Sequence, residues 1–138
     1  MAVNYVLNQR VNPRDLSAPR KYYAQAKTSG EETTRKLATE ISKRTNLSVS
    51  DVIAVIEAFI DLIPERLADG MIVRLGEFGS FYLTISSEGV EQPDDFNISM
   101  IKGYNLNFRP GKEVGKVLNN IEYKKLAGQE TQPTNPTD

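Results

Sequence analysis

The strongest pattern of apolar and polar positions lies in the middle of the chain. Apolar side chains recur at intervals of three and four residues, which is the spacing of one face of an α-helix. Ser48 and Asp51 match a capping box at the start of this helix. Pro64 predicts a kink near its end, and Gly70 predicts where the helix stops. One small sheet cannot cover so wide a face, and we expect it to form a homodimer interface. Its residues are Val52, Val55, Ile56, Phe59, Ile60 and Ile63.

Weaker periodic patterns predict two further helices. Residues 31–45 place Leu37, Ala38 and Ile41 on one face, with Glu31 and Glu32 in the first turn, where carboxylates suit the helix dipole. A last helix follows residues 109–111, with the proline of that run at or near its first turn.

Strand patterns flank these helices. Residues 3–11 alternate, with Val3, Tyr5 and Leu7 on the apolar face and Asn8 on the polar face. They are predicted to form a hairpin with residues 20–28, around a loop that contains two prolines. Further strands are predicted over 71–75, 78–86, 97–108 and 121–126. The order strand-strand-helix-helix-strand-strand-strand-helix-strand favours an α+β fold.

The composition removes several classes of function. The chain of 138 residues has no cysteine and no histidine, which excludes disulfides, thiolate metal sites and the Ser-His-Asp and Cys-His triads. We expect the protein to have no enzymatic activity and to bind neither a cofactor nor a metal ion. The N-terminus lacks the pattern of a signal peptide, and no apolar run reaches the roughly 18 residues of a membrane span, so we expect a cytoplasmic protein.

The net charge of −1 hides an uneven distribution. Residues 1–30 carry five basic side chains and one acidic one, and residues 101–127 carry six basic and two acidic ones. Residues 71–100 are acidic, with one basic side chain against five carboxylates. If the fold joins the two basic segments, they form one patch for a polyanion.

Residues 37–118 resemble the HU and integration-host-factor family of bacterial histone-like proteins. The resemblance rests on the order and spacing of several short motifs, none of them specific alone. The run Glu77-Phe78-Gly79-Ser80-Phe81 is similar to the family's Gly-Phe-Gly-Thr-Phe turn, and Phe108-Arg109-Pro110-Gly111-Lys112 to its Phe-x-x-Gly-Lys entry into the last helix. The preceding Asn12-Pro13 and Lys21-Tyr22-Tyr23-Ala24 point to a longer, HU-HIG type of HU-like protein with an N-terminal strand extension.

This resemblance implies an HU-like fold: a two-helix base, an antiparallel sheet with a β-arm, and a C-terminal helix. An added N-terminal β-hairpin and a short C-terminal strand complete it. We expect residues 1–30 to form a strand extension packed on the core, 31–127 the HU-like core, and 128–138 a disordered tail, because that tail has no apolar residue. The resemblance further implies a dimer whose two sheets form a saddle for double-stranded DNA in the nucleoid.

Two basic groups are candidates for phosphate contacts that tolerate any DNA sequence. The first is predicted on the saddle and the last helix: Arg74, Lys102, Arg109, Lys112 and Lys116. The second surrounds the N-terminal loop: Arg10, Arg14, Arg20 and Lys21. The alternative for the first group is a solvated face with local ion pairs, and for the second a mobile, solvated loop.

The arm departs from the family pattern. An ordinary HU arm is basic and carries a proline that wedges between base pairs. Here residues 86–97 contain four carboxylates and no lysine or arginine. The residues of its tip are Glu91, Gln92, Pro93, Asp94, Asp95 and Phe96. We expect this arm to repel DNA, or, in an alternative function, to bind a protein partner as part of an HU-fold interaction module.

Overall fold

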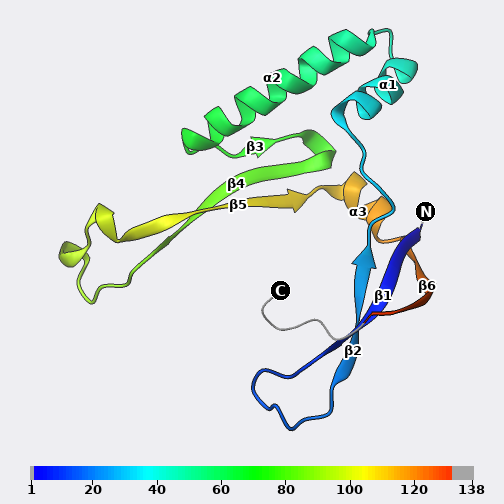
Figure 1. The fold of residues 1–138 in the computed structure, drawn as a ribbon. Coiled ribbons are helices and arrows are strands. Elements are labelled where there is room, and N and C mark those ends of the chain that lie inside the picture. Colours follow the sequence, from blue (N-terminus) through cyan, green and yellow to red (C-terminus); the bar gives the residue numbers. More distant parts are fainter. Residues whose placement is uncertain (1, 132–138) are drawn as a thin grey trace. The chain divides into compact units, whose positions relative to one another are not determined.

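The computed structural model describes residues 2–131, which form two compact units (Figure 1). Unit 1 combines the described residues up to Glu31 with those from Asn120 onward. Unit 2 is Glu32–Asn119. Residues 120–127, which the sequence analysis placed in the HU-like core, group with the N-terminal strands in unit 1. No helix in the described part of the chain has the length and apolar character to cross a membrane.

Unit 1 is a three-stranded sheet in the order β2-β1-β6. Its strands are β1 (Ala2–Arg10), β2 (Lys21–Lys27) and β6 (Glu122–Thr131). β1 and β2 run antiparallel, which confirms the predicted hairpin, and β6 runs parallel to β1. β6 also includes residues 128–131, where the sequence predicts the start of a disordered tail. The rest of that predicted tail, residues 132–138, lies outside the described residues.

The burial of the two faces of β1 differs from the prediction. Val6 and Asn8 are its most buried side chains, with 5% and 7% of their surface exposed, whereas Val3, Tyr5 and Leu7 are half-buried. The predicted polar face is thus the more buried one. The Asn8 side-chain amide donates a hydrogen bond to the Gln25 side-chain carbonyl on β2, which offsets the cost of burying a polar group.

The helices of unit 2 are α1 (Thr34–Arg44) and α2 (Val49–Ala68). Ser48 caps α2 and forms the predicted capping box with Asp51, and the helix continues through Pro64. At its end, Gly70 adopts a positive φ of 82° that favours glycine. The prediction that Glu31 and Glu32 lie in the first turn of α1 is wrong. Thr33 caps this helix instead, because its side chain accepts a hydrogen bond from the Lys36 backbone N–H.

The sheet of unit 2 has the antiparallel order β3-β4-β5. Its strands are β3 (Val73–Arg74), β4 (Gly79–Ser87) and β5 (Ile101–Pro110), followed by α3 (Lys112–Leu118). Three 3₁₀ turns complete the unit: η1 (Gly76–Phe78), η2 (Pro93–Asp95) and η3 (Ile98–Met100). The strand predicted from residue 97 therefore begins only at Ile101. Asn97 caps η3 through its side chain, and this local hydrogen bond competes with strand pairing.

Two glycines allow a close approach between the segment around η1 and the segment where β5 leads into α3. A Cβ atom at Gly79, whose φ is 147°, would collide with the backbone carbonyl of Arg109 and, at 2.7 Å, with the Phe108 ring. A Cβ atom at Gly111 would collide with the carbonyl of Glu77. The Gly111 N–H donates to the Phe78 carbonyl at 2.8 Å. The two short runs that carry the family resemblance therefore meet each other in space.

A single chain leaves much apolar surface uncovered. The buried hydrophobic side chains among the described residues are Val6, Ala38, Val52 and Leu67. On α2, Val55, Phe59 and Ile60 are 49%, 46% and 58% exposed. The C-terminal part of α2 and the strands β4 and β5 also line an apolar groove of about 480 Å³. Its lining residues are Ile63, Pro64, Leu67, Ala68, Phe81, Leu83, Tyr104 and Leu106.

Candidate nucleic-acid interface

Alternation along β4 gives the sheet of unit 2 two chemically different faces. Residues that pair directly across strands lie on the same face of a sheet. Phe81 pairs with Phe108 and their ring centroids are 4.9 Å apart, which marks the apolar face. The other face carries hydrophilic and aromatic side chains, and we call it the polar sheet face. Its residues are Arg74, Ser80, Tyr82, Thr84, Asn105, Asn107 and Arg109.

Arg74, Ser80 and Arg109 form a row across the three strands. Ser80 pairs with Arg74 on one side and with Arg109 on the other. The two arginine Cα atoms are thus about 10 Å apart, at two strand spacings. Together with Ile72 and Tyr82, these residues line a hollow of about 210 Å³. Two arginines at a shallow hollow are a suitable arrangement for binding phosphate oxygens.

The guanidinium groups of Arg74 and Arg109 are available to bind an anion. Both arginine side chains are exposed, and neither forms an ion pair with a carboxylate among residues 2–126, whose side chains the structure describes. The Arg109 guanidinium lies 6.0 Å from the centroid of the Tyr82 ring. This contact holds the guanidinium in the region of the ring, and its N–H groups remain able to bind an anion.

The polar neighbours of these arginines were not among the site residues predicted from the sequence. Ser80 and Tyr82 line the hollow, and the Asn107 side-chain amide donates to the Thr84 hydroxyl at 3.0 Å beside it. The signal was present in the strict alternation of residues 80–86, where Ser, Tyr, Thr and Ser occupy every second position. To place these side chains beside the arginines also required the register between β4 and β5, which could not be predicted from the sequence.

The three candidate lysines of unit 2 are not members of the arginine row. Lys102 lies at a register irregularity between β4 and β5, outside the paired positions. It is seven residues from Arg109 along β5, or about 23 Å. Lys112 begins α3 directly after Gly111, close in sequence to Arg109. Lys116 forms an ion pair with Glu113 at 3.2 Å, with both side chains largely exposed.

The second basic group lies in unit 1, where Arg10 ends β1 and Lys21 begins β2. These two residues pair across the strands. Arg14 and Arg20 lie in the exposed loop between them. The structure thus assembles this group around one end of one hairpin.

The acidic arm connects β4 and β5. The Glu88 N–H donates to the Met100 carbonyl at 3.0 Å and closes the arm at its base. The η2 turn carries Asp94 and Asp95, and the neighbouring Phe96 and Ile98 are 43% and 81% exposed. No group of three or more acidic side chains is arranged to hold a metal ion within residues 2–126.

Comparisons with known proteins agree with this architecture. The family model described as "HU domain fused to wHTH, Ig, or Glycine-rich motif" (HU-HIG) matches residues 1–125. An integration host factor subunit beta of Marinobacter nauticus is 31% identical over 80 residues, which cover 56% of this chain and 82% of that protein. A crystal structure of a candidate bacterial DNA-binding protein from Bacteroides vulgatus ATCC 8482 matches with a TM-score of 0.62 and 13% identity. The match covers 94% of this chain, which spans half the length of that protein. The chain belongs to the HU-HIG family of HU-like and integration-host-factor-like proteins.

Proposed function

We propose that the protein binds double-stranded DNA as a homodimer, as a non-enzymatic protein of the nucleoid. Binding is mainly to backbone phosphates and therefore tolerates different sequences. The observation that carries the proposal is the row of Arg74, Ser80 and Arg109, which presents two cations on one sheet face, neither paired with a carboxylate whose side chain the structure describes. The names of the two relatives, an integration host factor and a candidate DNA-binding protein, support the same class of ligand.

The exposed apolar surface of unit 2 supports the dimer. Val55, Phe59 and Ile60 are each about half exposed, although they lie on the most apolar helix of the chain. The neighbouring groove of about 480 Å³ is lined by apolar and aromatic side chains. Monomeric proteins seldom leave contiguous apolar surface of this kind in water. A second copy of unit 2 covers it in the proposed assembly, and each copy then contributes one polar sheet face.

The proposal is tested by binding of the full chain to a labelled 30-base-pair duplex at about 50 mM salt. We expect a complex that unlabelled duplexes of unrelated sequence displace equally well, because phosphate contacts carry no sequence information. Fluorescence anisotropy measures both binding and competition. Absence of a complex at this salt concentration would contradict the proposal and favour a protein-binding module. A strong preference for one duplex would contradict the proposed sequence tolerance but not the proposed binding to DNA.

Neutralising the acidic arm is expected to tighten binding. The variant Glu91→Gln, Asp94→Asn, Asp95→Asn removes three carboxylates that repel phosphate, and we expect duplex affinity at about 50 mM salt to rise by roughly twofold to tenfold. The control variant Glu57→Gln, Asp61→Asn, Glu65→Gln removes the same charge from exposed positions on α2. It tests for an effect of net charge alone. Weaker binding by the arm variant would show that these carboxylates shape the arm instead of repelling the duplex.

A further inference from the structure

The end of the β1–β2 hairpin places like charges against each other. Arg10 and Lys21 are direct cross-strand partners in unit 1. Like charges in this position destabilise a strand pair, and a hairpin gains nothing from keeping them for stability alone. Arg14 and Arg20 add two more cations in the connecting loop.

The loop does not supply a counter-ion for this pair. Asp15 is the one acidic residue between Arg10 and Lys21. Its Oδ1 atom accepts hydrogen bonds from the Ser17 hydroxyl at 2.6 Å and from the Ser17 N–H at 3.0 Å. These hydrogen bonds lower the pKa of Asp15 and commit its carboxylate to the turn. Neither Arg10 nor Lys21 forms an ion pair with any carboxylate in the part of the chain that the structure describes.

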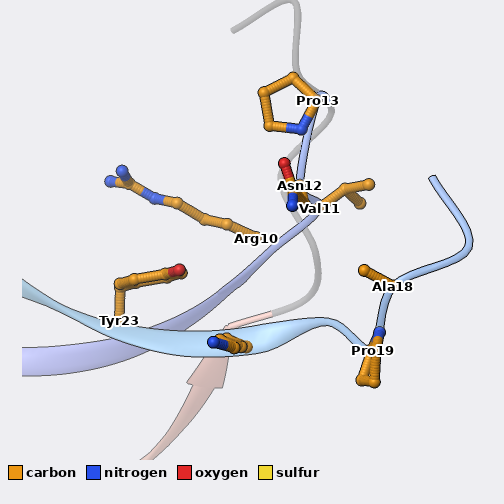
Figure 2. A pocket seen from close by; sticks show the side chains of 8 residues that line it. Arg10, Val11, Asn12, Pro13, Ala18, Pro19 and Tyr23 are labelled. Atoms are coloured by element: carbon orange, nitrogen blue, oxygen red, sulfur yellow. The ribbon is translucent and has the colours of Figure 1, made fainter. Parts of the chain in front are cut away.

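A hollow opens beside these two cations. Its volume is about 590 Å³, and Arg10, Lys21 and Tyr23 line it together with residues of both loop ends. The Arg10 guanidinium carbon lies 5.8 Å from the centroid of the Tyr23 ring, and Figure 2 shows the two side chains next to each other. A guanidinium held over an aromatic ring is oriented in advance, and its N–H groups remain free to bind an anion.

We propose that this hollow binds a phosphate group of the nucleic-acid backbone, as a contact surface distinct from the polar sheet face. The proposal rests on the proposed function, which supplies the nucleic acid. An anion there relieves the repulsion between Arg10 and Lys21. Pro13, Ala18 and Pro19 give the hollow an apolar lining that suits the sugar next to a phosphate. Free inorganic phosphate would leave that lining unfilled.

The test compares two doubly neutralised variants of the full chain. Arg10→Gln, Lys21→Gln removes the cation pair of the hollow. The control Lys27→Gln, Lys124→Gln removes the same charge from the same sheet, because both lysines pair with Asn4 near the other end of β1. That end is six residues from Arg10, or about 20 Å. Duplex affinity is measured for both variants and for the wild type between about 50 and 200 mM salt.

We expect the Arg10 and Lys21 variant to bind about tenfold to a hundredfold more weakly at 100 mM salt, with a slope of log affinity against log salt that is shallower by about 1 to 2. The control should stay within about twofold of the wild type. Thermal unfolding shows whether each variant is folded, and the midpoint of the Arg10 and Lys21 variant should be unchanged or higher because repulsion is removed.

The possible failures of the test are distinct. A wild type that binds no duplex overturns the proposed function, and this inference with it. A wild type that binds, with equal loss in both variants or in neither, overturns the inference alone. Inorganic phosphate at about 1 mM distinguishes the two sources of phosphate in a calorimetric titration. Binding heat that appears with the wild type and not with the Arg10 and Lys21 variant would show that the ligand of the hollow is the free anion and not nucleic acid.

Discussion

Replacing Phe59 by aspartate is expected to abolish the dimer. Phe59 is 46% exposed in a single chain and lies beside Val55 and Ile60 on α2, so the proposed assembly buries it against the second copy. A buried carboxylate without a partner costs several kcal/mol, which is a large fraction of the total stability of a small protein. Light scattering should show the wild type at twice 15.4 kDa, and the variant as a 15.4 kDa chain or as unfolded protein.

The conservative variant Phe59→Leu serves as its control. Leucine keeps the apolar character and most of the volume of the side chain. We therefore expect a dimer whose free energy of unfolding is lower by about 1 kcal/mol. Circular dichroism separates dissociation from unfolding. A folded, monomeric wild type at micromolar concentration, or a dimeric Phe59→Asp variant, would contradict the proposed interface.

Reversing the charge of the arginine row is expected to have the largest effect on DNA binding. Each lost phosphate contact costs roughly a factor of ten near 100 mM salt, and the variant removes four contacts from the proposed dimer, so Arg74→Glu, Arg109→Glu should weaken binding by roughly ten-thousandfold. Both side chains are exposed, so the variant should fold as the wild type does. Fluorescence anisotropy with a short duplex measures the loss, and circular dichroism verifies the fold.

The matched control for the row is Arg74→Lys, Arg109→Lys. Lysine keeps the charge but lacks the planar fork of guanidinium, so we expect a loss of no more than about fivefold if electrostatics dominate. A similar loss in both variants would show that the geometry of the hollow matters more than its charge. No loss in the glutamate variant would place the DNA contacts elsewhere on the protein.

Local signals predicted the helices well. The capping box of Ser48 and Asp51 and the stop at Gly70 appear where the sequence placed them. These features depend on hydrogen bonds between residues a few positions apart. The start of α1 was misplaced because two acidic residues near a helix look like its first turn, whereas the Thr33 side chain determines the cap.

Pairing between distant segments was not predictable in the same way. β6 pairs with β1 in parallel across more than one hundred residues, and no local pattern encodes that partner. This pairing makes β1 a central strand and buries Asn8, which alternation alone assigned to the exposed face. The candidate arginines followed from charge and resemblance. Their arrangement with Ser80 and Tyr82 required the register of three strands.

The most direct test of the central claim is the salt dependence of duplex binding by the wild-type chain. Two arginine rows in a dimer offer four phosphate contacts, so log affinity should fall linearly with log salt concentration, with a slope of about −3 to −4 or steeper. The acidic arm should add no such contacts, because it carries no lysine or arginine. A slope near zero, or no binding at about 50 mM salt, would contradict an electrostatic DNA-binding surface on the polar sheet face.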